Sequence, residues 1–175
     1  MRPRQTSWVG DGGATAANPT GRVPQAMEIR EVMTGSVVTA PAGTPVRQIA
    51  EMMRERNVGS VVLTDDDGKA VAFITDRDLA VSVLADGHDG GAAAADHASA
   101  PVVCGRPGMD VEEATQLMVS HGIRRLPILD GGRLTGIVTL DDLAARIGDP
   151  GLAANITAQV TRAALPNFYF HDRGG

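Results

Sequence analysis

Aromatic residues are scarce in this sequence, at 3% of 175 residues, although hydrophobic residues make up 43%. The core must therefore be built from Val, Ile, Leu, Met and Ala. Cysteine is nearly absent as well, because Cys104 is the single one. One cysteine excludes an intramolecular disulfide and predicts a reducing, cytoplasmic location. We expect Cys104 to be a small buried side chain.

Basic residues are outnumbered, with 16 Lys and Arg against 21 Asp and Glu and a net charge of −5. A protein that binds the phosphate backbone of nucleic acid needs a basic face, so this function is disfavoured. No apolar run approaches the length of a membrane span. Arg2 and Arg4 are not followed by the apolar segment of a secretory signal. The sequence thus predicts a globular protein with neither a membrane nor a nucleic acid as partner.

One motif occurs twice in the chain. Each copy is a run of β-forming residues, then Thr, then Asp three positions later at the start of an apolar helical pattern. Thr75 with Asp78, and Thr139 with Asp142, have the spacing of a helix capping box. Such a helix start also directs backbone N–H groups outward, which suits a phosphate. The motif by itself leaves open whether the two turns only cap helices or also hold a ligand.

The segments around the two copies match as well. Val46 and Val111 are 65 positions apart (111 − 46), whereas Thr75 and Thr139 are 64 apart (139 − 75). One residue has been lost in the intervening hairpin turn, where a change of length costs little. A repeat of this length indicates two copies of one supersecondary unit. We therefore predict an α/β (α+β) fold of two tandem β-α-β-β-α units with pseudo-twofold symmetry.

Periodicity and punctuation place the elements of the first unit. Thr44 is expected as the N-cap and Pro45 as the first residue of a helix that Asn57 ends. Gly68, in an Asp-rich turn, is expected at positive φ between two strands. The predicted elements are a helical turn at 28–33, strands at 37–38, 60–64 and 70–74, and helices at 45–56 and 76–84.

The second unit is predicted in the same way. Asp110 is expected as the N-cap of a helix that Gly122 ends. Pro127 within a strand predicts a bulge or an unpaired position. The predicted elements are strands at 102–104, 125–129 and 134–138 and helices at 111–121 and 140–147.

Composition divides the rest of the chain. The predicted division is a disordered tail at 1–27, a unit at 28–86, a linker at 87–95, a unit at 96–148 and a C-terminal tail at 149–175 with a possible short helix. The Gly- and Ala-rich linker is expected to be solvated and offers no fixed frame for a metal. Trp8-Val9 is either incidental or a contact for a partner. Phe168-Tyr169-Phe170 either docks on the body or contacts a partner.

Several of these features resemble a known family. The β-α-β-β-α unit, Met33-Thr34, the strand at 123–127 and the two Thr-x-x-Asp turns are similar to CBS domains, which in tandem form a Bateman module. The resemblance covers about residues 28–147 and implies a stand-alone CBS-pair protein similar to the hypoxic response proteins. It implies a regulatory adenosyl ligand, namely AMP, ADP, ATP or S-adenosylmethionine. It also implies a homodimer, no catalysis, and an unidentified effector protein as a partner.

The resemblance also implies roles for single residues. Asp78 and Asp142 would accept hydrogen bonds from ribose hydroxyls, and Thr75 and Thr139 would bind phosphate. Arg77 would pair with phosphate as well. The residues that would enclose the adenine are Ser36, Val37, Val58 and Gly59, or Pro101, Val102, Ile123 and Arg124. A ribose diol requires acceptors, and a phosphate is bound by N–H groups, hydroxyls and guanidinium groups, so these residue types suit the ligand.

The two predicted sites differ in charge and in room. Arg77 is matched in the second copy by Asp141, which cannot pair with phosphate, whereas Arg124 and Arg125 are expected to add charge to the second site. Ala72 stands where the family commonly has the glycine seen at Gly136. A methyl group there is expected to narrow the first cleft and leave the second roomier. The sequence does not decide which site binds.

Two functions remain open from the sequence alone. The first is a dimeric nucleotide sensor, and the second is a scaffold or interaction module with empty clefts. The sequence contains neither a nucleophile–base pair at a useful spacing nor a metal-ligand cluster, so nothing in it indicates an enzyme. For the dimer, Leu79, Val83 and Leu143 are expected to face a partner, because leaving such apolar faces exposed is costly.

Overall fold

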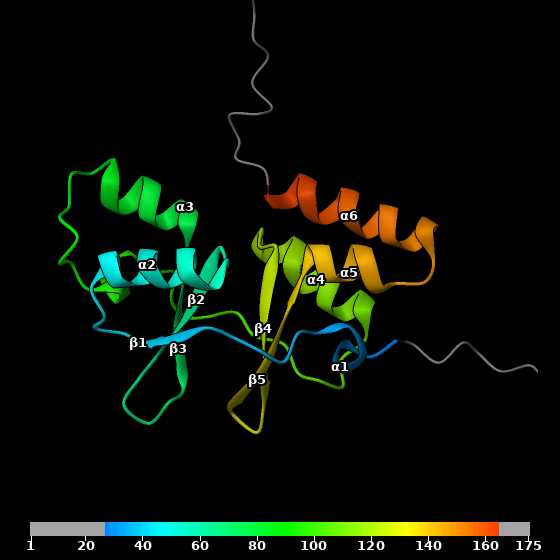
Figure 1. The fold of residues 1–175 in the computed structure, drawn as a ribbon. Coiled ribbons are helices and arrows are strands. Elements are labelled where there is room, and N and C mark those ends of the chain that lie inside the picture. The colour runs from blue at the N-terminus through cyan, green and yellow to red at the C-terminus, as the bar shows by residue number, and fades with distance from the viewer. Residues whose placement is uncertain (1–26, 165–175) are drawn as a thin grey trace, which may run out of the picture.

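A computed structural model describes residues 27–164, which form two small α/β units standing side by side (Figure 1). The first unit contains β1 (Thr39–Pro41), α2 (Val46–Arg56), β2 (Ser60–Thr64), β3 (Ala70–Thr75), α3 (Asp76–Asp78) and the π-helix η1 (Leu79–Leu84). The second unit contains α4 (Val111–His121), β4 (Arg125–Asp130), β5 (Arg133–Thr139), α5 (Leu140–Arg146) and α6 (Pro150–Ala164). Two short helices, α1 (Ile29–Val32) and the 3₁₀ helix η2 (Ala94–His97), precede the units in sequence. None of the helices in residues 27–164 is long and apolar enough to span a membrane.

The helix and hairpin signals in the sequence are largely confirmed. Asn57 ends α2 in the left-handed conformation (φ 52°), and Gly122 does the same for α4 (φ 62°). The Asp110 side chain accepts from the Glu113 N–H at 2.7 Å, as an N-cap does. The N-cap predicted at Thr44 is wrong by one residue, because Pro45 is the N-cap. The Thr44 carbonyl accepts instead from the backbone N–H of Ala94.

The two units differ at their first strand. In the first unit, β1 pairs in parallel with β2, and the Val62 N–H donates to the Val38 carbonyl at 3.0 Å. The paired strand begins at Thr39, so the strand predicted at 37–38 lies two residues too early. In the second unit, Pro127 stands 65 positions after Val62 and has no N–H to donate.

The strand predicted at 102–104 is accordingly wrong. Only Gly105 forms a bridge with Ile128 there, and the sheet has two strands, β4 and β5, in place of three. Pro127 is paired with Ile137 of β5, and its carbonyl accepts from the Gly105 N–H at 2.8 Å, so the unpaired position that the sequence offered as one alternative is wrong. The bulge has another origin, because both units carry one at matched positions, between Leu63 and Thr64 and between Ile128 and Leu129. Since the first unit has no proline there, the bulge belongs to the repeat.

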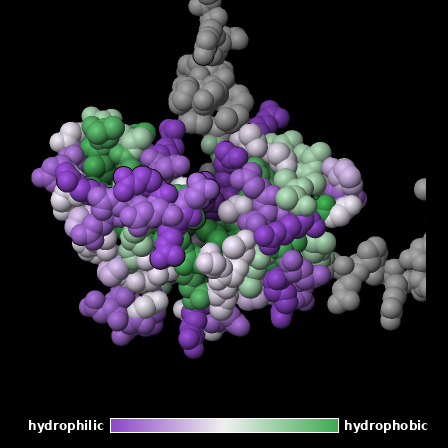
Figure 2. Space-filling model, in the orientation of Figure 1, coloured by the Kyte–Doolittle hydropathy of each residue, from purple (hydrophilic) through white to green (hydrophobic). Residues whose placement is uncertain are grey.

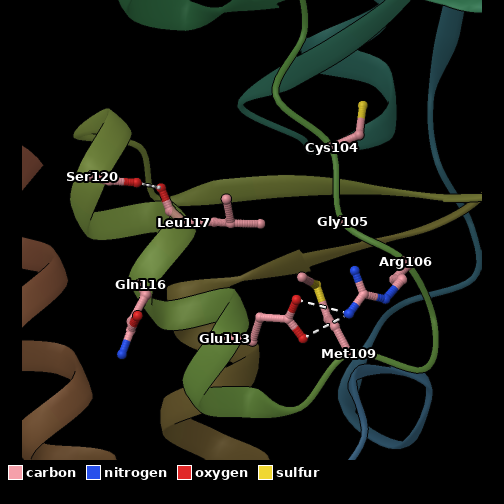
Figure 3. Close-up of a pocket in the computed structure, with 8 residues that line it drawn as sticks. All are labelled: Cys104, Gly105, Arg106, Met109, Glu113, Gln116, Leu117 and Ser120. Carbon is pink, nitrogen blue, oxygen red and sulfur yellow. Dashed lines mark hydrogen bonds and ion pairs between the residues drawn. The ribbon is translucent and has the colours of Figure 1, made fainter.

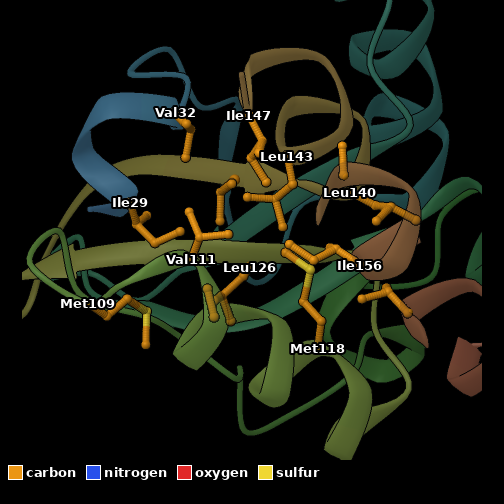
Figure 4. Close-up of a cluster of buried hydrophobic side chains, with 14 of the residues drawn as sticks. Ile29, Val32, Met109, Val111, Met118, Leu126, Leu140, Leu143, Ile147 and Ile156 are labelled. Atoms are coloured by element: carbon orange, nitrogen blue, oxygen red, sulfur yellow. The ribbon is translucent and has the colours of Figure 1, made fainter. Parts of the chain in front are cut away.

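The short helices α1 and η2 are exchanged between the units. Ile29 and Val32 of α1 are buried in the core of the second unit, as Figure 4 shows, and Ala94 of η2 is buried in the core of the first. The backbone contacts match across the repeat: Ile29 N–H donates to Met109 O, and Ala94 N–H donates to Thr44 O, both at 2.9 Å. The segment predicted as a solvated linker therefore packs against the first unit. Each unit therefore contains a short helix that precedes the other unit in the sequence. The consecutive division predicted from the sequence does not show this exchange.

The predicted C-terminal helix is α6, and it belongs to the second core. Ala153, Ile156 and Val160 are buried where α6 lies across α4 and α5. Figure 4 shows Ile156 in one cluster with residues of α1, α4 and α5. The aromatic cluster Phe168-Tyr169-Phe170 and Trp8-Val9 lie outside the described residues.

Gly136 makes room for the exchanged segment. A Cβ atom on Gly136 would lie 2.7 Å from Met33 Sδ and 3.0 Å from the Thr34 carbonyl oxygen. The matching pair in the first unit is Ala72 with Ala98. Ala72 on β3 is larger than Gly136, and Ala98 on the exchanged segment is smaller than Met33. Gly136 and Ala72 are both buried in the packed cores, and neither lines a cleft. The expectation that Ala72 narrows a ligand cleft is therefore wrong.

We expect Gly136→Ala to lower the free energy of unfolding by about 1–3 kcal/mol, because the new methyl group overpacks Met33 and the Thr34 backbone. Gly148→Ala is the control, since a Cβ atom there meets nothing within 4 Å. Urea denaturation followed by circular dichroism measures both. Equal stabilities for the two variants would contradict the close packing at Gly136.

Candidate functional site

Two clefts lie where the units meet, and each is built from both units. The Thr75 cleft combines the turn at Thr75–Asp78 with residues 101–103 and 123–125 of the second repeat, and its volume is about 530 Å³. The Thr139 cleft combines the turn at Thr139–Asp142 with residues 36–38 and 58–60 of the first repeat, and its volume is about 230 Å³. Small-molecule sites usually enclose about 300–1,000 Å³, so of these two clefts the Thr75 cleft alone reaches that size.

Every residue predicted for a ligand site lines one of these two clefts. The Thr75 cleft holds Thr75, Arg77, Asp78, Pro101, Val102, Ile123, Arg124 and Arg125. The Thr139 cleft holds Ser36, Val37, Val58, Gly59, Thr139 and Asp142, and Arg125 lines it as well. The sequence predicted that Arg124 and Arg125 add positive charge to the site at the Thr139 turn. This is wrong for Arg124, which lines the Thr75 cleft alone. It holds in part for Arg125, which lines both.

Both predicted capping boxes are present. The backbone N–H and the hydroxyl of Thr75 both donate to Asp78 Oδ2 at 2.8 Å, and the Asp78 N–H donates to Thr75 Oγ1 at 3.2 Å. Thr139 and Asp142 repeat this geometry at 2.9, 2.7 and 3.1 Å. Each turn therefore fixes one carboxylate oxygen by itself, and the second oxygen decides what else the carboxylate can bind.

The second oxygens of the two carboxylates have different surroundings. Asp142 Oδ1 accepts from Thr34 Oγ1 at 3.3 Å and pairs with Arg146 Nη2 at 3.3 Å. For Asp78, the described residues supply donors only to Oδ2. A carboxylate has about four lone-pair sites. Asp78 thus keeps about two of them for a ligand, which is the number that a ribose diol needs.

The charges of the clefts also differ. Arg77, Arg124 and Arg125 line the Thr75 cleft together with Asp76 and Asp78. In the Thr139 cleft, Arg125 faces two aspartates, Asp141 and Asp142. Guanidinium groups beside a helix N-terminus bind phosphate well, so the Thr75 cleft suits an anionic ligand better. The packing of the two units brings Arg77 of the first repeat and the two arginines of the second into the same cleft.

Phe73 is a cleft residue that the sequence analysis missed. It is the one aromatic residue in the described part of the chain, and it lines both clefts. Phe73 lies two positions before Thr75 on β3, and residues i and i+2 of a strand share a face. That spacing was the signal by which it could have been found. With Val102, Ile123 and Pro127, it gives the Thr75 cleft an apolar wall against which a nucleobase can pack.

A further cavity of about 530 Å³ lies beside α4 (Figure 3). Its one basic side chain, Arg106, is paired with Glu113 at 2.8 Å and 3.0 Å. Cys104 lines this cavity and is half-buried, less than the sequence predicted. Burial raises the pKa of the Cys104 thiol, so at neutral pH it stays protonated and is a poor nucleophile. This cavity therefore has neither a free cation nor an activated nucleophile.

Nothing within residues 27–164 resembles a metal centre, since no group of three or more His, Cys, Asp or Glu side chains there is placed to hold an ion. His88 and His97 approach each other, with ring centroids 4.7 Å apart, and His97 Nδ1 shares a hydrogen bond with Ser82.

Comparison with protein families finds the CBS domain twice, over residues 29–85 and 94–149. The chain is similar to the CBS domain-containing protein YhcV of Bacillus subtilis, with 39% identity over 116 residues that cover 66% of this chain and 82% of that protein. Hypoxic response protein 1 of Mycobacterium tuberculosis is 28% identical over 137 residues, which cover 78% of this chain and 96% of that protein.

Two solved structures have the same fold. Hypoxic response protein I with two coordinated zinc ions has a TM-score of 0.64 and 29% identity, and the match covers 69% of this chain and 99% of that one. A CBS domain protein of Pyrobaculum aerophilum complexed with AMP has a TM-score of 0.65 and 23% identity, and the match covers 75% and 99%. At 23% identity the second likeness shows the fold alone.

Proposed function

Because this chain belongs to the CBS-domain family and carries two CBS domains in tandem, we propose that it is a non-catalytic regulatory protein that binds an adenosyl ligand in the Thr75 cleft. Among adenosyl ligands we favour the nucleotides AMP, ADP and ATP over S-adenosylmethionine. The reason is the excess of guanidinium groups in this cleft, which stabilise the negative charge of a phosphate.

The observation that carries the proposal is the state of Asp78. Its Oδ2 atom holds the helix cap, and its Oδ1 atom receives no donor from the described residues, beside a cleft of about 530 Å³. A capping role alone needs only one carboxylate oxygen. We infer that the other oxygen accepts from the two hydroxyls of a ribose and that Arg77, in the same cleft, pairs with the phosphate, whereas Thr75 already donates its N–H and its hydroxyl to Asp78.

The walls of the cleft suggest how binding would be transmitted. Asp78 and Phe73 belong to the first repeat, whereas Val102 and Ile123 belong to the second. A ligand that contacts both sides stabilises one relative position of the two units, and so shifts the population of conformations that an effector protein meets. The relative from Pyrobaculum aerophilum, complexed with AMP, supports the idea that this fold can hold such a ligand.

The test is calorimetric titration of the full chain with AMP, ADP, ATP and S-adenosylmethionine. We expect saturable binding of at least one of the three nucleotides, with a stoichiometry of one per chain. No heat with any of the four compounds at millimolar concentration would refute the proposal. A scaffold with empty clefts would then be the better account.

We also propose a homodimer, formed through η1. The helix face expected from the sequence needs correction, because Leu143 is 0% exposed and Val83 is 8% exposed, so both belong to the core. The apolar residues that η1 does expose are Val81, at 51%, and Leu84, at 78%. Figure 2 shows hydrophobic surface over this helix. In the second unit, α6 packs over α4 and α5. Among the described residues, no helix of the first unit packs over η1 in the same way.

Leu84→Asp is therefore expected to convert a dimer into a monomer, because it places a charge in the apolar contact. Light scattering coupled to size exclusion measures the mass. Leu152→Asp is the matched control, since Leu152 on α6 is also exposed, at 46%, but lies outside η1. If wild-type protein and the Leu84 variant have the same mass, η1 is not the dimer contact.

A further inference from the structure

The Thr139 cleft carries the same Thr-x-x-Asp motif as the Thr75 cleft, but both oxygens of its carboxylate already contact the chain. Asp142 Oδ2 accepts from the Thr139 N–H and hydroxyl, and Oδ1 accepts from Thr34 and pairs with Arg146. Three hydrogen bonds and one ion pair thus surround a carboxylate that has about four lone-pair sites. The Asp142 side chain is only 15% exposed. A ribose could bind here only by displacing donors of the chain itself.

Arg146 is the donor that anchors this arrangement. Its Nη1 atom donates to the carbonyls of Val32 at 2.9 Å and Met33 at 3.1 Å, and its Nη2 atom donates to Thr34 Oγ1 at 3.3 Å. Nη2 also lies 3.3 Å from Asp142 Oδ1. The guanidinium therefore joins the exchanged segment after α1 to the carboxylate. Its planar fork allows several such contacts at once, which the ammonium group of a lysine would not reproduce.

The first repeat has no counterpart of this contact among the described residues. The position that matches Arg146 is Ser82 (146 − 64), whose hydroxyl shares a hydrogen bond of 3.0 Å with His97 Nδ1. Ser82 thus forms a hydrogen bond with the exchanged helix η2, and the described residues show no hydrogen bond between Ser82 and Asp78. At this position of the helix that follows each Thr-x-x-Asp turn, the two repeats therefore differ in whether the side chain reaches the aspartate.

We propose that Arg146 locks the Thr139 cleft by pairing with Asp142 Oδ1 and by holding Thr34 against the same oxygen, so that the chain binds one adenosyl ligand in place of two, and that loss of this guanidinium releases both contacts and opens a second site. This inference rests on the proposed function for its ligand class. The opened site would take a nucleoside without phosphate, because Asp141 stands where the Thr75 cleft has Arg77 and would repel an anion.

The experiment compares calorimetric titrations of adenosine and AMP into the full chain and into Arg146→Ser, which installs the residue type of the first repeat. We expect wild-type protein to bind one molecule of either compound per chain. Arg146→Ser should bind two molecules of adenosine but still one of AMP. Circular dichroism checks that the variant is folded, since Arg146 also contacts the carbonyls at the end of α1.

Two double variants assign the new site. Arg146→Ser with Asp142→Asn should lose the second adenosine, and Arg146→Ser with Asp78→Asn should keep one adenosine at Asp142. A stoichiometry of one for adenosine in Arg146→Ser, or of two in wild-type protein, would overturn the lock. If wild-type protein binds neither compound, the proposed function fails. The lock then stands only if Arg146→Ser with Asp78→Asn binds adenosine.

Discussion

Asp78→Asn is expected to weaken AMP binding by about 100-fold or more, whereas Asp142→Asn should leave it within about twofold of wild type. In the first variant the amide oxygen can still accept from Thr75, but the amide nitrogen, a donor, would then face the ribose hydroxyls. Hydrogen bonds to a charged group contribute about 1.5–3 kcal/mol each, and each 1.4 kcal/mol is about tenfold in affinity. Losing two such bonds predicts the stated effect.

Asp142→Asn is the matched control because it makes the same chemical change in the same capping motif. The wild-type carboxylate there is engaged by Thr34 and Arg146 and is not available to a ligand. Calorimetry with AMP measures both variants, and urea denaturation checks that both are folded. Equal loss of affinity in the two variants would contradict a single site at Asp78. Loss only in Asp142→Asn would place the ligand in the other cleft.

Ile156→Ala is expected to lower the free energy of unfolding by about 2–5 kcal/mol, the usual cost of removing a buried aliphatic side chain. Ile156 on α6 is 3% exposed and lies among residues of α1, α4 and α5 (Figure 4). The prediction tests whether α6 is part of the core of the second unit or only a tail attached to it. Urea denaturation of the full chain gives the stability.

Leu152→Ala, on the same helix, is the comparison. Leu152 is 46% exposed, so its removal should change the free energy of unfolding by no more than about 0.5 kcal/mol. A small effect of Ile156→Ala, similar to that of Leu152→Ala, would show that α6 does not stabilise the domain. The helix would then be the tail that its position in the chain suggests.

Several errors of the sequence analysis have one cause, which is contact between segments far apart in the chain. The strand predicted at 102–104 fails because Pro127, more than twenty residues later, cannot donate to it. The linker predicted as solvated is packed because η2 replaces α1 in the core of the first unit. Gly136 was expected to widen a ligand cleft, but the residue it accommodates is Met33, from the opposite end of the described chain.

Local sequence was sufficient to predict the repeat, the hairpins, most helix caps and the two Thr-x-x-Asp turns, because each depends on residues within a few positions of one another. The resemblance to a family added the residues that line the clefts. How these residues are grouped depends on the tertiary fold. The packing of the two units joins the turn of each repeat to residues of the other, so that three arginines line the cleft that holds Asp78 while Thr34 reaches Asp142. Spacing along one chain cannot reveal this, since the two repeats carry the same local signals and differ in what packs against them.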